Sequence, residues 1–304
     1  MSRDGSSSQS TRSNTEGVSL DLPRTLFGYD VVQHLGDGAG SRIYAVTHGS
    51  TSQLYALKHV RRTNDKSLRF IEQLENEYAV AKQLRHPHLR GVVNVHVHRT
   101  LLRRVTDAAL VMELVDAMPL DVHLPARISD TLGIFIKTAH GLAAMHGAGF
   151  VHCDLKPANI LASANGAEVK VIDLGQACRS GVAKQRIQGT PDYIAPEQVK
   201  CKPVSPQTDI YNFGASLYWS LTGSKLPTLF TLKKGENSFL VDSQIATPAQ
   251  LNPLVSEPLS AFVTECVRTN PAKRPESMTS VAARLDVLRD STRRAEDARR
   301  ASVA

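Results

Sequence analysis

Apolar and polar positions alternate along the first third of the chain, a pattern typical of β-strands. Val31 to Leu35 and Ile43 to His48 predict two strands joined by a glycine-rich turn. Leu54 to Val60 also alternates with a period of two, so Ala56 and Lys58 belong to one face of a strand. These segments predict a hairpin followed by a further strand, and a lysine beside a small apolar residue suggests that this face lines a cleft.

Leu68 to Leu84 follows a different period and predicts an amphipathic helix. The apolar positions that recur at three- and four-residue steps are Phe70, Leu74, Tyr78, Ala81 and Leu84. At about 100° per residue, Glu77 lies nearest this stripe, Glu75 at its margin and Glu72 on the opposite face. A carboxylate beside a core-facing stripe needs a partner, so Glu77 is the candidate to pair with a cation.

Later segments add short strands and a final helix. Val111 to Val115 predicts a buried strand, Gly149 to Val151 a helix exit into a short strand, and Ile160-Leu161 the strand that follows. Met278, Val281, Leu285 and Leu288 form one stripe of a last helix. Because arginines dominate after this stripe, residues 289–304 are predicted to be a basic tail that forms a frayed, solvated helix.

Composition limits the class of protein. The 304 residues are 41% hydrophobic, which is enough for a sizeable core, and no run is long enough to span a bilayer. Residues 1–27, rich in Ser and Thr at their start, predict a disordered leader without an apolar signal. Four widely spaced cysteines favour a reducing, cytoplasmic location over disulfides or zinc. The net charge of +7 is scattered, so no nucleic-acid partner is expected.

The segment from His152 to Asn159, His-Cys-Asp-Leu-Lys-Pro-Ala-Asn, is the most informative for chemistry. It places a carboxylate, Asp154, an ammonium, Lys156, and an amide carbonyl, Asn159, in one turn-rich loop between two predicted strands. Phosphoryl transfer uses this combination: a base for a hydroxyl proton, a cation for the moving charge and an oxygen ligand for a divalent metal.

This loop resembles the catalytic loop of the eukaryotic-type (Hanks) protein kinase family, and four further motifs recur in the family's order. They are a glycine-rich loop at Leu35–Tyr44, a third-strand lysine motif at Tyr55–Lys58, a metal-binding motif at Asp173–Gly175 and an activation-segment end at Ala195–Glu197. The Lys-Pro pair after Asp154 is similar to serine/threonine kinases, and the short activation segment resembles bacterial members.

The resemblance covers residues 28–288 and implies an α+β, protein-kinase-like bilobal fold. A small antiparallel β-rich N-lobe with one helix is expected over about 28–115, and a larger, mainly helical C-lobe over about 116–288.

The resemblance also implies an ATP site between the lobes. Its residues are Leu35, Gly36, Asp37, Gly38, Ala39, Gly40, Ser41, Ile43, Ala56, Lys58, Met112, Glu113, Val115 and Leu161. Glycines allow backbone amides to approach phosphate oxygens, although Ser41 replaces the third glycine of the family. Ile43, Ala56 and Leu161 would enclose the adenine. Backbone groups of Glu113 and Val115 would bond its edge, with Met112 behind it.

The same resemblance assigns catalytic roles. Asp154 would orient the acceptor hydroxyl, which belongs to a serine or threonine of a protein substrate, and Lys156 would neutralise the transferred group. Lys58, held by Glu77, would reach the nucleotide phosphates. Asn159 and Asp173 would hold Mg²⁺, with Mn²⁺ as a possible substitute.

Some positions depart from the family or are expected to be structural. Cys153 replaces an arginine that binds an activation-loop phosphate in many members, which predicts activity without that phosphate. Cys153 and Cys178 are interpreted as small apolar fillers, and four histidines between His86 and His98 as solvated or satisfied. Glu197 and Arg274 are expected to form an ion pair. Asp209 is expected to accept hydrogen bonds from the catalytic loop.

Three other functions remain open. A pseudokinase scaffold is disfavoured because Lys58, Asp154, Asn159 and Asp173 are all present. A small-molecule kinase is disfavoured by the Gly-Thr-Pro-Asp-Tyr run that begins at Gly189. Nucleic-acid binding by the arginine tail is the weakest alternative. The sequence leaves the substrate, the upstream signal and the oligomeric state undetermined.

Overall fold

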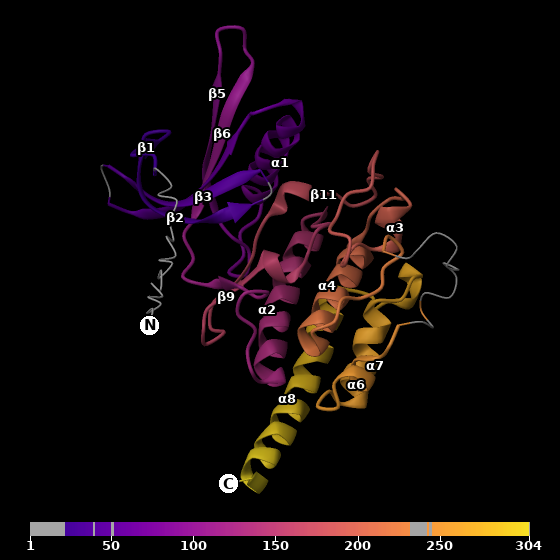
Figure 1. Cartoon of the computed structure of the whole chain (residues 1–304). Helices are drawn as coiled ribbons and strands as arrows, with labels where there is room; N and C mark the ends of the chain where they lie inside the picture. Colours follow the sequence, from indigo (N-terminus) through magenta and orange to yellow (C-terminus); the bar gives the residue numbers. More distant parts are fainter. Residues whose placement is uncertain (1–21, 39, 50–51, 232–241, 243–244, 304) are drawn as a thin grey trace, which may run out of the picture.

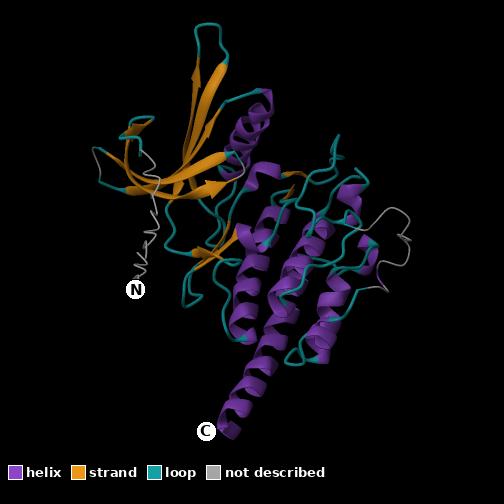
Figure 2. Cartoon of the chain, in the orientation of Figure 1, coloured by secondary structure: helices purple, strands orange, loops and turns teal. Residues whose placement is uncertain are grey.

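A curled antiparallel sheet forms the first part of the structure (Figures 1 and 2). The computed structural model describes residues 22–38, 40–49, 52–231, 242 and 245–303, so Ala39 and residues 1–21 of the predicted leader lie outside the described residues. The strands are β1 (Thr25–Leu26), β2 (Tyr29–Gly38), β3 (Ser41–His48), β4 (Leu54–Arg61), β5 (Val92–Arg99) and β6 (Val105–Glu113). Their order is β1-β2-β3-β4-β6-β5.

The strands extend further than the sequence pattern predicted. The β2–β3 ladder continues into the glycine-rich segment, where Gly38 pairs with Ser41. At the other end, Leu26 of β1 pairs with Tyr29, so the sheet begins inside the expected leader, upstream of position 28. Backbone pairing does not depend on apolar side chains, which explains why the hydrophobic pattern underestimated these ends.

Helix α1 (Asp65–Ala81) packs against one face of the sheet. It begins three residues before the predicted start because the Asn64 side chain caps it, accepting a hydrogen bond from the Ser67 N–H at 3.0 Å. The buried cluster between helix and sheet consists of Ala56, Val60, Ile71, Leu74, Ala108, Leu110 and Met112. This packing fixes the position of the helix that carries Glu77.

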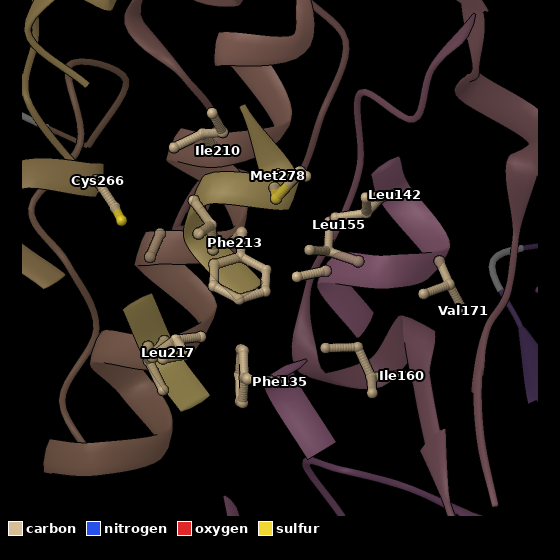
Figure 3. Close-up of a cluster of buried hydrophobic side chains, with 14 of the residues drawn as sticks. Phe135, Leu142, Leu155, Ile160, Val171, Ile210, Phe213, Leu217, Cys266 and Met278 are labelled. Atoms are coloured by element: carbon tan, nitrogen blue, oxygen red, sulfur yellow. The ribbon is translucent and has the colours of Figure 1, made fainter. Parts of the chain in front are cut away.

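The second part of the structure is mainly helical. Its helices are α2 (Ile128–Gly147), α3 (Pro196–Val199), α4 (Pro206–Thr222), α6 (Pro248–Leu251), α7 (Glu257–Cys266) and α8 (Met278–Val303), with 3₁₀ turns η1 (Pro157–Asn159), η2 (Leu174–Gln176) and η4 (Pro271–Lys273). Figure 3 shows the core between them, where Phe135 of α2 meets Phe213 of α4 edge-on at 5.2 Å between ring centroids. None of the described helices combines the length and apolar character needed to cross a bilayer.

Among the described residues, five short strands lie in the segments that follow the six-stranded sheet. They are β7 (Met118–Pro119), β8 (Phe150–Val151), β9 (Ile160–Ala162), β10 (Val169–Val171) and β11 (Cys178–Arg179), paired as β10-β9-β7 and β11-β8. The predicted strands at Phe150-Val151 and Ile160-Leu161 are present. The predicted strand at 111–115 instead ends at Glu113.

The C-terminal segment is helical and mostly exposed, as expected, but the helix does not fray and part of it packs on the rest of the chain. Helix α8 continues without a break from Met278 to Val303, and in Figure 1 it runs beside α2. Glu296 bonds the α2 N-terminus, accepting from the Ile128 N–H at 2.8 Å, and Thr292 is buried. Polar side chains make these contacts, so an apolar stripe could not reveal them. The expected α+β architecture, with an antiparallel sheet followed by a helical half, is confirmed.

Candidate active site

The loop between β8 and β9 is held from beneath by Asp209 of α4. Its Oδ2 accepts from the His152 N–H at 2.8 Å and its Oδ1 from the Cys153 N–H at 2.9 Å, as predicted. A third bond comes from His146 Nε2, 2.8 Å from Oδ2. Burial alone would raise the pKa of Asp209, but the bond from His146 and the other donors outweigh it and lower the pKa. Asp209 therefore stays a charged acceptor that fixes the loop.

The buried ring of His152 braces the same loop from inside. The Asp154 N–H donates to His152 Nδ1 at 3.2 Å, so the ring proton lies on Nε2, which donates to the Ile172 carbonyl at 3.1 Å. Ile172 directly precedes Asp173 in the sequence. One histidine thus links the loop that carries the candidate base to the segment that carries a candidate metal ligand.

Asp154 is the central carboxylate of this site and is 6% exposed. The Thr190 hydroxyl donates to Oδ1 at 2.9 Å, and Gln176 Nε2 donates to Oδ2 at 3.0 Å. Lys156 Nζ lies 3.7 Å from Oδ2 and donates to the Thr190 oxygen at 3.0 Å. Burial raises the pKa of Asp154 despite the opposing charge of Lys156. A carboxylate with a raised pKa is a better proton acceptor, and the adjacent ammonium suits an anionic group that moves past it.

Asn159 and Asp173 have free oxygens that fit a divalent cation. Asn159 Nδ2 donates to the Asp154 carbonyl at 2.8 Å, which leaves Oδ1 as the atom able to bind metal. The Asn159 carbonyl accepts from the Ile172 N–H at 3.0 Å, so this residue lies beside the start of the Asp173 motif. Only one oxygen of Asp173 bonds Lys58. Two protein oxygens completed by phosphate and water suit Mg²⁺.

Lys58 of β4 joins the sheet half to the helical half. Its Nζ lies 2.7 Å from Glu77 Oε2 and 3.0 Å from Asp173 Oδ1. Burial by itself would lower the pKa of Lys58, but the two carboxylates outweigh it and raise the pKa above its usual value. Of the three candidate glutamates, Glu77 is the one that contacts Lys58, whereas Glu72 is exposed and Glu75 pairs with Arg99 at 3.7 Å.

The glycine-rich hairpin lies at the end of the sheet nearest Lys58. Ile43 of β3 pairs with Lys58, and Ala45 pairs with Ala56. Gly40 has a φ of 77° and packs so closely on the Phe70 ring of α1 that a Cβ there would lie 2.5 Å from it. Gly36, Asp37, Gly38 and Ser41 complete the described hairpin after Leu35. This placement agrees with a flap over phosphates, while Ala39 lies outside the described residues.

The predicted adenine-side residues lie along the connection between the two halves. Met112 is buried at the end of β6, and Leu161 is buried in β9. The Glu113 N–H donates to the Gly91 carbonyl at 2.9 Å. The Glu113 side chain bonds Lys170 at 2.7 Å. Val115 follows β6 and is buried. Their contacts with a nucleotide remain predictions.

The end of the activation segment is anchored to the helical half. Arg274 and Glu197 form the predicted ion pair in a two-point arrangement, with distances of 2.7 and 3.0 Å. Next to it, Gln198 Nε2 donates to the carbonyl of Cys153 at 2.7 Å and to that of Gln188 at 3.0 Å. The segment is thereby tied directly to the catalytic loop.

Three residues of the site were missed by sequence reasoning. Asn76 of α1 donates to the carbonyls of Gly175 and Ala177 at 3.1 and 2.9 Å, Gln176 contacts Asp154, and His146 contacts Asp209. Asn76 carried a partial signal, because it precedes Glu77 on the same helix. Gln176 lies directly after the Asp173–Gly175 motif, and this position is the signal that could have found it.

Comparison with known families agrees with the resemblance to protein kinases. The family description "Protein kinase domain" matches residues 29–284 of this chain. The chain belongs to the protein kinase family. This match covers both the sheet half and the helical half, and its range includes every predicted site residue.

Several proteins named as serine/threonine-protein kinases are similar in sequence. A probable serine/threonine-protein kinase of Corynebacterium efficiens is 30% identical over 280 residues, which cover 86% of this chain and 41% of the relative. Serine/threonine-protein kinase PknD of Chlamydia caviae is 28% identical, over 85% of this chain and 31% of its own length. A mouse relative, "Inactive serine/threonine-protein kinase PLK5", is 32% identical over 79% of this chain and 40% of its own. The chain thus spans well under half the length of these relatives.

Proposed function

We propose that this kinase domain transfers the γ-phosphoryl group of ATP to serine or threonine hydroxyls of protein substrates, itself included, with Mg²⁺ as cofactor. One observation supports the proposal most strongly: Lys58 contacts Glu77 and Asp173 at 2.7 and 3.0 Å, which brings the two halves together beside Asp154. This arrangement provides a cation, a metal-binding oxygen and a base in one region.

Each group would contribute a separate part of the reaction. Asp154 would accept the proton of the substrate hydroxyl and orient its oxygen, while Lys156 would stabilise negative charge on the transferred group. Lys58, kept charged by its two carboxylates, would hold the phosphates of the nucleotide. Mg²⁺ bound by Asn159 and Asp173 would neutralise the phosphate oxygens. Because Asp209 and His152 hold the loop rigidly, little reorganisation is needed before transfer.

The alternative is that this chain is a pseudokinase, and one similar protein, from mouse, is named as inactive. Such a protein would bind nucleotide or a partner without transferring phosphate. In this chain Asp154 is buried, hydrogen-bonded and next to Lys156, and Lys58 has both of its predicted partners. These contacts favour catalysis, since a scaffold has no need of a buried carboxylate with a raised pKa.

Radiolabelled ATP with a lysate as substrate tests the proposal. The parent protein is expected to label serine and threonine residues, and Asp154→Ala to label them at least about a thousandfold more slowly. Nucleotide binding should survive in Asp154→Ala and be weakened in Lys58→Met, as measured by calorimetry. Equal labelling by parent and Asp154→Ala would reject the assigned base, and nucleotide binding without any labelling would favour the pseudokinase.

The location is a further part of the proposal. The described cysteines carry free thiols, and Cys153 and Cys178 are unbonded at 3.8 Å between sulfurs. These thiols support a reducing cytoplasm as the site of action. Fractionation of cells that express the chain would test it, since recovery with the membrane fraction would contradict a cytoplasmic location.

A further inference from the structure

Two cysteines meet beside the catalytic loop, although the sequence suggested only apolar fillers. Cys153, immediately before Asp154, lies with its sulfur 3.8 Å from that of Cys178. Cys178 belongs to β11, which pairs with β8 through the Val151–Cys178 register. Figure 1 shows β11 at the end of the helical half that faces the sheet. The sulfurs are in van der Waals contact without being bonded, since a disulfide requires about 2.05 Å.

We propose that Cys153 and Cys178 form a peroxide-sensitive dithiol. Its oxidation gives a disulfide (the staple) that links the catalytic loop to the activation segment and slows phosphoryl transfer. The loss of turnover rests on the proposed kinase function. Formation of the staple does not.

The two thiols differ in the way that such a reaction requires. Cys153 is 1% exposed and packs with Val151 and Val204, whereas Cys178 is only partly buried. The hydrogen-bond contact with Cys153 lowers the pKa of Cys178 to about 7, and the charge of Lys184 contributes in the same direction. The same contact, together with burial, raises the pKa of Cys153. Cys178 is therefore the nucleophile and Cys153 the resolving thiol.

The chemistry balances with hydrogen peroxide as the oxidant. The Cys178 thiolate attacks one peroxide oxygen, the O–O bond breaks, and the departing hydroxide takes a proton to become water. The sulfur of Cys153 then attacks the sulfenic acid sulfur of Cys178, the S–O bond breaks, and the hydroxide leaves with the Cys153 proton as a second water. Two electrons pass from the sulfurs to one peroxide, giving one disulfide and two waters.

The disulfide would disturb the active site because it closes a ring of chain that contains the candidate catalytic and metal-binding residues. The positions are 25 residues apart, and the closed ring contains Asp154, Lys156, Asn159 and Asp173. Closing the sulfur separation from 3.8 Å to about 2 Å draws the backbone next to Asp154 towards β11. The Cys153 backbone already has φ of 67° and is held by Asp209 and Gln198, so it has little freedom to absorb the shift. Displacements of this size cost catalysis up to about a hundredfold.

The test treats the full chain with a small excess of hydrogen peroxide and then with dithiothreitol. Intact mass and peptide mapping should show the loss of two hydrogen atoms and a Cys153–Cys178 peptide. The unfolding temperature should rise by several degrees, because the staple restricts the unfolded chain. Turnover should fall about tenfold or more and recover on reduction.

Matched variants identify the thiols. Cys178→Ser should keep its turnover under peroxide, and Cys153→Ser should give a sulfenic acid at Cys178 that a 1,3-diketone traps, without a crosslink. Cys201→Ser, which removes another partly buried thiol, should respond like the parent. Failure of the crosslink to form, or a crosslinked protein with undiminished turnover, would overturn the proposal. A reduced parent without activity would refute only the kinase function, because mass and unfolding temperature still decide whether the staple forms.

Discussion

The pKa values of two buried aspartates of the site, Asp154 and Asp209, are shifted in opposite directions. Burial raises the pKa of Asp154, because its two neutral donors and the Lys156 ammonium at 3.7 Å do not outweigh the loss of solvation. The pKa of Asp209 is lowered, because its donors outweigh burial. A raised pKa means that the ionised carboxylate destabilises the folded state, whereas a lowered pKa means that it stabilises it. The ionised Asp154 carboxylate thus lowers the stability of the folded state but is a better proton acceptor. The ionised Asp209 carboxylate stabilises the loop that carries Asp154.

This difference predicts opposite effects for one substitution. Asp154→Asn should abolish turnover yet raise stability at pH 7 by about 1 kcal/mol, or roughly 2–4 °C. Asn can still accept from Thr190. If the Gln176 amide turns over, its buried Oε1, which has no hydrogen-bond partner, can accept from the new amide. The gain should vanish as pH falls towards the ordinary aspartate value of 3.8. Thermal unfolding of the parent and the variant between pH 4 and 7 measures this gain in stability.

Asp209→Asn is the matched control for that measurement. It should lose about 2–4 kcal/mol at pH 7, since it removes a charged acceptor that bonds two backbone N–H groups. This loss should also shrink at acid pH, when the parent carboxylate becomes protonated. If both variants shifted stability in the same direction, the two carboxylates would not have opposite effects on the stability of the folded state.

At the level of elements, the end of α8 completes the start of α2. Helix α2 begins at Ile128 without a side-chain cap from Arg127, and Glu296 supplies one from a distant part of the chain. Its Oε1 accepts from the Ile128 and Ser129 N–H groups at 2.8 and 3.3 Å, and its Oε2 bonds Arg127 at 3.1 Å. Burial would raise the pKa of Glu296, but the bonds from Ser129 and Arg127 outweigh it and lower the pKa.

Glu296→Gln is therefore predicted to cost about 1–2 kcal/mol in the free energy of unfolding at neutral pH. Because the folded pKa is depressed, the stabilisation is present above the ordinary value of 4.5 and is lost as pH falls through the folded value. Urea unfolding at pH 7 and pH 3.5 measures the difference. Asp297→Asn is the control, since that carboxylate is more exposed and should cost under about 0.5 kcal/mol. An equal loss in both variants would argue against the cap.

The same element shows what a sequence can and cannot predict. The stripe from Met278 to Leu288 predicted a helix because apolar burial repeats every turn. Glu77 could likewise be selected among three glutamates by its angle to such a stripe. Glu296, Asn76 and Gln176 act through polar contacts with distant backbone or side-chain atoms, which leave no periodic trace in the sequence. Periodicity and ordered motifs therefore predicted the fold and the main site residues, while the polar bracing required coordinates.

For the whole molecule, the two halves and the activation segment are already assembled around the site. The sheet half supplies Lys58 and Glu77, and the helical half supplies Asp154 and Asp173. Asn76 ties α1 to the segment after Asp173. Further along, Thr190 bonds Asp154 and Gln198 bonds the catalytic loop. These contacts are made by unmodified side chains, which predicts that docking of the segment does not depend on a phosphate.

Activity is accordingly predicted to be independent of activation-segment phosphorylation. Cys153, where many kinases have a phosphate-binding arginine, is 1% exposed and has no charge to offer. Ser180 is exposed, and its N–H bonds the Gly149 carbonyl at 3.0 Å without involving the hydroxyl. Phosphatase-treated parent protein and Ser180→Ala should therefore keep turnover within about twofold of the untreated parent in a steady-state peptide assay. Thr190→Ala should lose at least about tenfold, because its hydroxyl orients Asp154, and Thr190→Ser should recover most of it. A tenfold loss in Ser180→Ala would show instead that a phosphate at this position completes the site, and that the contacts around Thr190 and Gln198 alone do not hold the segment in place.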